Sequence, residues 1–177
     1  MSGVPGPRRL WSLREDVHVE ADPGTGSVIL HSRWGAHPLP RTSPIVREAL
    51  RRMTFGPISL ENVTSDPAER ARIIDVLEPV GHLVVRSVAA ESDRLLLSVV
   101  PLAPEARFGL RDLNDGCLVR MSRFAIQRTS GDEYRLESPL SLHNVILHDP
   151  AAVRLVAPLG RPVRPGEVRS SGSSAGD

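Results

Sequence analysis

The sequence contains no lysine, since all 22 of its basic residues are arginine. This excludes any mechanism that depends on a Schiff-base lysine or on a lysine that donates a proton. Cys117 is the only cysteine, so neither an internal disulfide nor a site with several thiolate ligands can form. Aromatic residues make up only 3% of the chain and apolar residues 40%. The core must therefore be built mainly from Leu, Val, Ile and Ala.

Long apolar runs and an excess of one charge are also missing. No stretch approaches the roughly 20 apolar residues that a membrane-spanning helix needs. Met1–Pro7 leads directly into charged residues, unlike a secretory signal peptide. The 22 basic and 21 acidic residues leave a formal charge of +1, whereas proteins that coat nucleic acids or membrane surfaces have a marked basic excess. We expect a cytoplasmic protein that binds neither nucleic acid nor a membrane.

The N-terminal part of the chain is predicted to begin with a β-hairpin. Residues 1–9 are expected to be disordered, because glycine and proline are frequent there. Two short alternating stretches, Val17–Val19 and Val28–Leu30, follow on either side of Asp22–Gly26, which is a strong turn signal. We interpret them as the paired strands of the hairpin.

Two helices and a second hairpin are predicted next. Ser43-Pro44 and Asp66-Pro67 each combine a capping residue with a proline at the first helical position. Glu69 lies three residues after Asp66, as in a capping box. His82–Val88 and Arg94–Val100 look like two strands of a wing. The residues of the second helix that we expect to face the core are Ala71, Ile73, Ile74 and Leu77.

An ungapped shift of 106 residues indicates a second copy of the first elements. It places Val28 on Tyr134 and Ser43-Pro44 on Asp149-Pro150. Each copy is a hairpin, a short apolar strand and a helix opened by a capping residue with proline. Proline and glycine then recur, and a serine- and glycine-rich tail follows. The second copy therefore lacks its partner helix and wing.

These elements predict an α+β fold in which one complete winged-helix-like unit precedes an incomplete one. The expected divisions are a disordered N-terminus at 1–9, a first unit at 10–104, a second unit at 105–157 and a flexible tail at 158–177.

Chemistry-bearing motifs are weak throughout. The six histidines show no H-x-x-x-H pair, so we predict no metal site. No Gly-x-Ser-x-Gly motif accompanies the serines, and Gly24–Gly26 lies between strands rather than before a helix. Arg47, Arg51 and Arg52 form the best basic patch, but Glu48 interrupts it. We therefore predict no catalytic, metal-binding or cofactor-binding residue.

Several blocks of the sequence nevertheless resemble one family, the SagB-type dehydrogenases that form thiazoles and oxazoles in ribosomal peptides. The blocks, in order, are Trp34-Gly35, Ser43-Pro44, Gly81–Ser87, Val119–Ala125, Gly131–Glu133, Leu136–Ser141 and Val145–Pro150. The resemblance covers roughly residues 10 to 157, the part that precedes the flavin domain in the family. It implies an oxidase that converts azolines to azoles with FMN, alongside a cyclodehydratase.

The resemblance does not supply catalytic residues. In the family, FMN and a Lys-Tyr proton-transfer pair belong to a nitroreductase-like domain further along, whereas this sequence has no lysine and only Tyr134 as tyrosine. We therefore expect a non-catalytic accessory region without a cofactor of its own, inactive when alone. It would position the precursor peptide, a cyclodehydratase or a nitroreductase-like subunit, and could form a homodimer.

Peptide capture is predicted at the wing. An extended leader peptide could add to a free edge of its strands, with Val84, Arg86, Leu95 and Leu97 as the binding residues. The alternative is that both strands pair within the fold or at a subunit contact. A different function, a small winged-helix transcription regulator, is less consistent with the sequence. Its recognition helix would mix Glu69, Asp75 and Glu78 with two arginines and so match a phosphate groove poorly.

Overall fold

The computed structural model describes residues 7–22, 24–39, 42–110, 113–114, 116–131 and 133–168. The strands are β1 (Arg8–Leu13), β2 (His18–Ala21), β3 (Val28–Ser32), β4 (Gly35–Leu39), β5 (Val84–Ala89), β6 (Leu95–Pro101), β7 (Ile126–Ser130), β8 (Glu133–Glu137) and β9 (His143–Leu147). The helices are α1 (Pro44–Met53), α2 (Pro67–Leu77) and α3 (Pro150–Val156), with 3-10 turns η1 (Leu60–Asn62), η2 (Gly81–Leu83) and η3 (Ala157–Gly160). The predicted α+β fold is confirmed.

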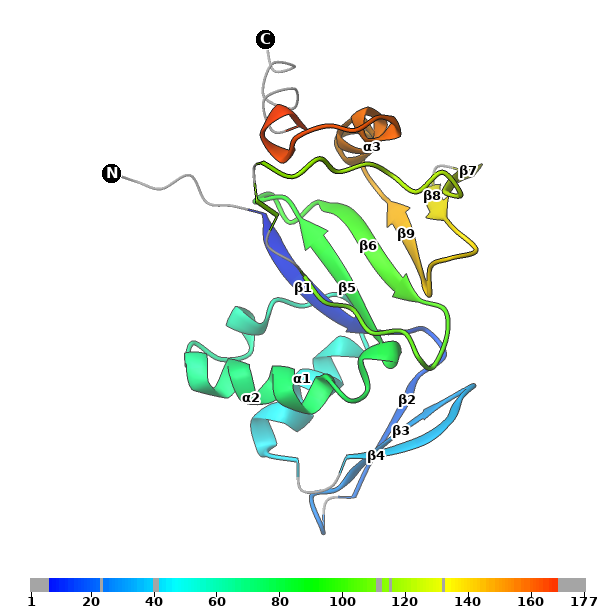
Figure 1. Cartoon of the computed structure of the whole chain (residues 1–177). Helices are drawn as coiled ribbons and strands as arrows, with labels where there is room; N and C mark the ends of the chain where they lie inside the picture. Colours follow the sequence, from blue (N-terminus) through cyan, green and yellow to red (C-terminus); the bar gives the residue numbers. More distant parts are fainter. Residues whose placement is uncertain are drawn as a thin grey trace, which may run out of the picture.

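Two antiparallel sheets organise the chain. β2, β3 and β4 form a three-stranded meander, and the other strands form a six-stranded sheet in the order β1-β5-β6-β9-β8-β7. Figure 1 shows the meander with α1 and α2 at one end of the molecule and α3 at the other. Because β9 pairs with β6, the second half of the chain extends the sheet that the first half begins.

The first unit has the predicted order of hairpin, two helices and wing hairpin. β2 and β3 pair around a turn in which the Asp22 carboxylate accepts hydrogen bonds from the Gly24 N–H at 2.8 Å and the Thr25 hydroxyl at 2.7 Å. β5 and β6 form the wing. β5 begins at Val84 rather than at His82, because the preceding residues form a 3-10 turn.

Strand β1 is the main element that the sequence analysis does not predict. It pairs with β5 from end to end. Arg8 and Arg9, which were assigned to a disordered N-terminus, lie opposite Ala89 and Val88, so that assignment is wrong for these two residues. The partner strand is distant in the sequence, and no local pattern indicates the pairing. Residues 1–6 of the predicted disordered segment lie outside the described part of the chain.

Both predicted helix starts are confirmed. α1 follows Ser43 and α2 follows Asp66, each with proline in its first turn. The Asp66 carboxylate accepts a hydrogen bond from the Ala68 N–H at 2.9 Å. The predicted capping box is wrong, because the Glu69 carboxylate accepts instead from the Thr64 hydroxyl at 2.6 Å, and the Asp66 N–H donates to that hydroxyl at 3.2 Å.

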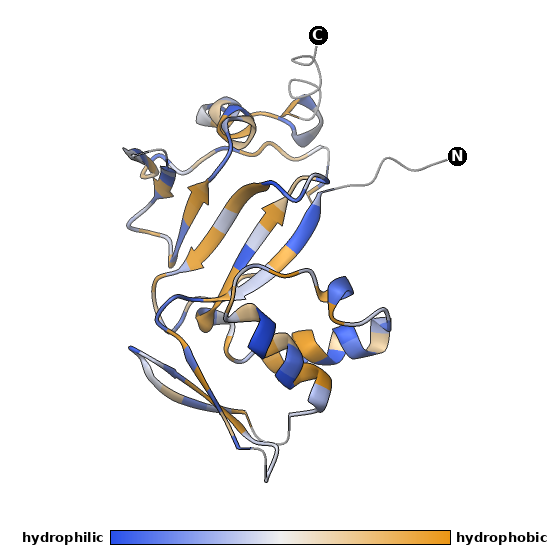
Figure 2. Ribbon diagram, turned by 180° about the vertical axis from the view of Figure 1, so that it is seen from behind, coloured by the Kyte–Doolittle hydropathy of each residue, from blue (hydrophilic) through white to orange (hydrophobic). Residues whose placement is uncertain are grey.

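One apolar core joins α1, α2, the meander and one face of the larger sheet. α2 buries Ile73 and Leu77, which are four residues apart, whereas Ala71 and Ile74 are exposed, contrary to prediction. Leu13 of β1 and Val84 of β5 belong to the same core. Figure 2 shows the accompanying alternation of apolar and hydrophilic residues along the strands. The residues that α1 contributes are Val46, Ala49, Leu50 and Met53.

The second unit repeats the topology of the first elements. The meander β7-β8-β9 followed by α3 matches β2-β3-β4 followed by α1. Asp149 caps α3 by accepting a hydrogen bond from the Ala151 N–H at 2.7 Å. The helix starts keep the predicted shift of 106, but the cross-strand pair Val28–Leu39 corresponds to Arg135–Ile146, a shift of 107. Strands and helix are thus offset by one residue between the two copies.

The flexible tail predicted from residue 158 is packed as far as residue 168. Val119 and Val163 exchange two backbone hydrogen bonds, of 2.9 and 3.0 Å, and Val163 is only 4% exposed. The frequency of glycine and proline does not reveal this, because the partner that holds the segment lies more than 40 residues earlier. Residues 169–177 lie outside the described part of the chain.

Candidate functional site

A groove lies between strand β2 and helix α1. Within the described part of the chain, β2 pairs with β3 only, so its other edge has no strand partner. The groove encloses about 640 Å³. We call it the edge groove; it is lined by Glu15, Val17, His18, Val19, Ala21, Val28, Arg47, Glu48, Arg51 and Thr54. An extended peptide lying there could hydrogen-bond to β2 while alternate side chains point toward α1.

The floor of the edge groove is apolar and fixed by the core. Val17 is 6% exposed and Val28 is 1% exposed, and both belong to the core cluster. Val19 packs against that cluster from β2. An arriving strand would therefore meet a preformed surface, which reduces the ordering cost of binding.

The α1 wall of the edge groove is positively charged. The Glu48 carboxylate accepts hydrogen bonds from Arg51 at 2.8 and 2.9 Å and from Arg52 at 2.7 Å. These bonds lower the pKa of Glu48 to about 2, so it is ionised at neutral pH and offsets one of the two arginines. Arg47, which donates to the Thr42 carbonyl, adds a further positive charge. Glu15 also lines the groove, so its lining carries two arginines and two carboxylates. Arg47 donates to a carbonyl rather than to a carboxylate and is therefore the cation best placed to meet an acidic side chain of a bound peptide.

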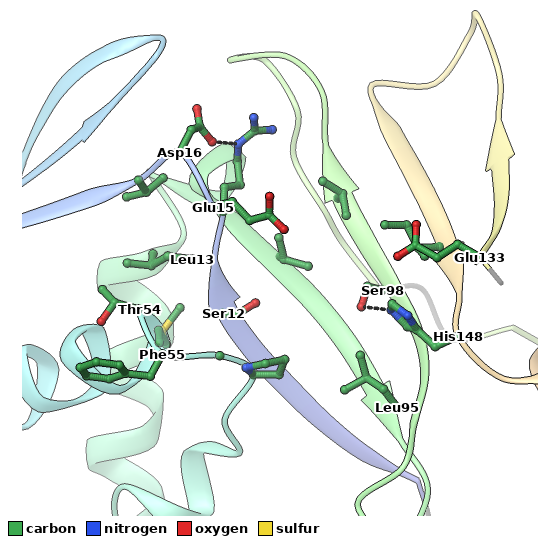
Figure 3. A pocket seen from close by; sticks show the side chains of 18 of the residues that line it. Ser12, Leu13, Glu15, Asp16, Thr54, Phe55, Leu95, Ser98, Glu133 and His148 are labelled. Carbon is green, nitrogen blue, oxygen red and sulfur yellow. Dashed lines mark hydrogen bonds and ion pairs between the residues drawn. The ribbon is translucent and has the colours of Figure 1, made fainter. Parts of the chain in front are cut away.

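A second groove lies on the face of the six-stranded sheet opposite the core formed with α1 and α2, with the end of α1 and the turn after it at its margin. Because side chains alternate along a strand, Leu13 and Val84 point into the core, whereas Ser12 and Val85 point to the opposite face. The cavity on that face encloses about 710 Å³ (Figure 3). We call it the sheet groove; its floor includes Ser12, Val85, Leu95, Ser98, Val100 and Ile146.

The charged groups at the margins of the sheet groove are paired. Arg14 and Asp16 are 2.8 Å apart, and Arg135 and Glu133 are 2.9 Å apart. Burial alone would raise the pKa of Asp16, but the hydrogen bond and charge of Arg14 outweigh it and lower that pKa. Arg33 lies 3.9 Å from Asp16 as well. With Glu15, the lining carries three arginines and three carboxylates, so the groove is close to neutral.

Hydroxyl groups and one imidazole line the middle of the sheet groove. The Ser87 and Ser98 hydroxyl oxygens are 2.8 Å apart, and Ser98 Oγ is 2.9 Å from His148 Nε2, as Figure 3 shows. Burial lowers the pKa of His148, so its ring is neutral at neutral pH. Across β5, the Ser12 hydroxyl makes no hydrogen bond with the described residues. The sequence does not reveal this cluster of hydroxyl groups and imidazole, because Ser98 and His148 are 50 residues apart.

The two grooves meet at one place. Glu15, Val17 and Thr54 line both cavities. The first two residues belong to the connection between β1 and β2, and Thr54 ends α1. A peptide that leaves the edge groove past these residues enters the sheet groove without crossing the core.

The four residues predicted to bind a peptide lie on interior strands. β5 is flanked by β1 and β6, and β6 by β5 and β9, so strand addition at a free edge of the wing is wrong. Val84 is 1% exposed, in the core. Arg86 lies 5.2 Å from the centre of the Trp11 ring, and burial lowers its pKa to about 10. Leu95 lines the sheet groove, whereas Leu97 does not. Peptide contact by these side chains stays a prediction.

The described residues form no group of three or more His, Cys, Asp or Glu side chains that could hold a metal ion. Cys117 is free and exposed. In the same described ranges, no helix has the length and apolar character that crossing a bilayer requires.

Comparison with protein families gives a match to cyanobactin oxidase ThcOx over residues 119–176. The matched segment contains the second meander and α3. Comparison with curated proteins gives no match. The family match links the chain to the azoline oxidases of ribosomal peptide biosynthesis.

Proposed function

We propose that the chain is the non-catalytic accessory region of a SagB-type azoline dehydrogenase and that it positions the precursor peptide for oxidation. The match to cyanobactin oxidase supports the family, and the absence of lysine supports a non-catalytic role, because the proton-transfer lysine of the family has no counterpart here. In this proposal FMN and the chemical step belong to a nitroreductase-like domain or subunit. That subunit and the cyclodehydratase are the expected protein partners.

The observation that carries the peptide role is the free edge of β2 beside the arginines of α1. Backbone hydrogen bonds to β2 would hold any extended peptide, and Arg47 would favour one with an acidic side chain at the facing position. β2 has only four residues, and each hydrogen bond contributes only about 0.5–1.5 kcal/mol net. About four such bonds supply at most roughly 6 kcal/mol, so we expect weak binding with a dissociation constant of roughly 0.1 mM.

Charge reversal on the α1 wall tests this proposal. Arg51→Glu is expected to weaken binding of a fluorescein-labelled leader segment, taken from the precursor peptide of the same gene cluster, by about tenfold or more. Arg154→Glu, which makes the same change on α3, is the matched control and should leave the affinity unchanged. Fluorescence anisotropy at two salt concentrations measures both. Equal weakening by the two variants would point to net charge alone and contradict the edge groove.

Hydrogen exchange locates the bound strand directly. Amides of β2 that face the edge groove are expected to exchange more slowly once the leader segment is bound. Those of β5 and β6 should keep their rates, because both of their edges are already paired. Protection confined to the wing would contradict the proposed location.

The residues of the sheet groove do not fit FMN. Its phosphate needs a free cationic anchor, whereas Arg14 and Arg33 share Asp16, at 2.8 and 3.9 Å, and Arg135 is held by Glu133. We therefore expect the purified chain, mixed with FMN and passed through gel filtration, to be colourless and inactive toward azolines. A near-stoichiometric flavin band in the visible spectrum, or oxidation by the chain alone, would contradict a non-catalytic role.

A further inference from the structure

Azoline formation changes which surfaces a peptide can bind. When a Cys, Ser or Thr side chain closes onto the preceding carbonyl with loss of water, the backbone loses that carbonyl oxygen and the following amide N–H. The ring nitrogen remains as an acceptor with no donor beside it. Such a segment cannot continue a β-ladder, for the same reason that proline interrupts one. It needs a surface that offers donor side chains and apolar contact instead of a strand edge.

We infer that the sheet groove binds the azoline or azole ring of the precursor peptide, while the edge groove holds its unmodified leader. This inference rests on the proposed function and adds a second site to it. Glu15, Val17 and Thr54 belong to both grooves, so one peptide can occupy both. The leader lies where backbone groups are free, and the ring lies where side chains form the surface.

The floor of the sheet groove matches a small heteroaromatic ring. Ser12 and Val85 are cross-strand partners, so their side chains lie about 5 Å apart on the same face. Val100 lines the groove beside them. The two valines offer apolar contact to the faces of the ring, and the unpartnered Ser12 hydroxyl can donate to the ring nitrogen.

The rest of the groove suits the uncharged peptide on either side of the ring. Ser98 and the neutral His148 present groups that can donate or accept hydrogen bonds to a neighbouring amide. The charged groups at the margins pair with one another. An uncharged ligand can therefore bind without leaving any of them unpaired. A volume of about 710 Å³ accommodates a five-membered ring with its flanking residues, within the usual range of ligand sites.

The test compares two short probes. The probes are an acetylated peptide amide with one thiazole between two alanines, and the same peptide with cysteine in place of the ring. Calorimetry is expected to show about five- to tenfold tighter binding of the thiazole peptide, the effect of one hydrogen bond with its apolar contacts. Chemical shifts of Ser12, Val85 and Val100 should move with the thiazole probe only. Equal affinities for the two probes would overturn the inference.

Variants separate the two grooves. Ser12→Ala should remove the preference for the thiazole probe, while Ser65→Ala, the same change at an exposed loop position, should keep it. Thermal unfolding of Ser12→Ala checks that the fold is retained. A thiazole preference that survives Ser12→Ala together with unchanged shifts at Val85 also overturns the inference.

The two proposals fail in different ways. Loss of leader binding in Arg51→Glu with an intact thiazole preference supports both grooves. No leader binding by the unaltered chain, but a thiazole preference abolished by Ser12→Ala, overturns the edge groove and leaves the ring site standing. Leader binding without a thiazole preference overturns only the ring site.

Discussion

Replacing Leu50 with alanine is expected to lower the free energy of unfolding by about 2–5 kcal/mol. Leu50 is 1% exposed and lies in the core cluster that joins α1 to α2 and the meander. Its side chain anchors the helix that carries Arg47 and Arg51, so leader binding at the edge groove should weaken in parallel. Only part of the resulting cavity is expected to close, because the packed residues around it can relax only partially.

Urea unfolding monitored by circular dichroism measures this effect. Leu140→Ala is the control, because Leu140 is 73% exposed and truncating it should change stability by less than about 0.5 kcal/mol. The same variants are then titrated with the labelled leader segment. A loss below about 1 kcal/mol in Leu50→Ala would mean that α1 is not held by this core.

Local signals in the sequence identified the helices well. A capping residue followed by proline acts within a single turn, so Ser43, Asp66 and Asp149 could each be recognised from their neighbours, and all three precede the helices of the structure. The hairpin at Asp22 is equally local. Which side chains are buried is harder to predict from neighbouring residues. Ile73 is buried and Ile74 is exposed because of where the rest of the core lies.

The candidate site was predictable only in part, because strand pairing is not local. The prediction of free wing edges failed since β1 and β9 occupy them, and neither partner is near the wing in the sequence. The free edge beside α1 belongs to β2, which the sequence analysis predicted as a strand without a binding role. The sheet groove depends on Ser12, Ser98 and His148, which are brought together from β1, β6 and the end of β9.

The protein is expected to lose stability as the pH falls below about 6.5, and protonation of His82 is one cause. His82 is 5% exposed, and neither ring nitrogen has a hydrogen-bond partner. Its ring centre lies 4.8 Å from that of His37 and 5.7 Å from that of Trp34. Burial first, and then the positive charges of His37, Arg107 and Arg14 against the weaker effect of Glu105, lower the pKa of His82 below 6.5.

The direction follows from proton uptake. The unfolded chain binds a proton at His82 near pH 6.5, while the folded protein resists it until a lower pH. The unfolded state therefore holds more protons in this window, and the free energy of unfolding decreases as the pH falls. Burial lowers the pKa of His143 and of His148 as well, which adds to the same trend. The contribution of His82 to the free energy of unfolding is fully present above about pH 6.5. It is lost as the pH falls through the pKa that His82 has in the folded protein.

His82→Phe isolates this residue, because phenylalanine keeps the ring that packs on Trp34 but has neither a proton to bind nor an unpartnered nitrogen. The variant is expected to gain about 1–3 kcal/mol at pH 7, the cost of a buried polar group without a partner. Its stability should also fall less steeply between pH 7 and 5, with the remaining slope due to His143 and His148. His18→Phe, at an exposed position, should show neither effect. Urea unfolding at several pH values measures the free energy of unfolding of each protein. If that free energy falls as steeply with pH in His82→Phe as in the unaltered protein, the pKa of His82 does not change on folding, because removing the responsible group must reduce the slope.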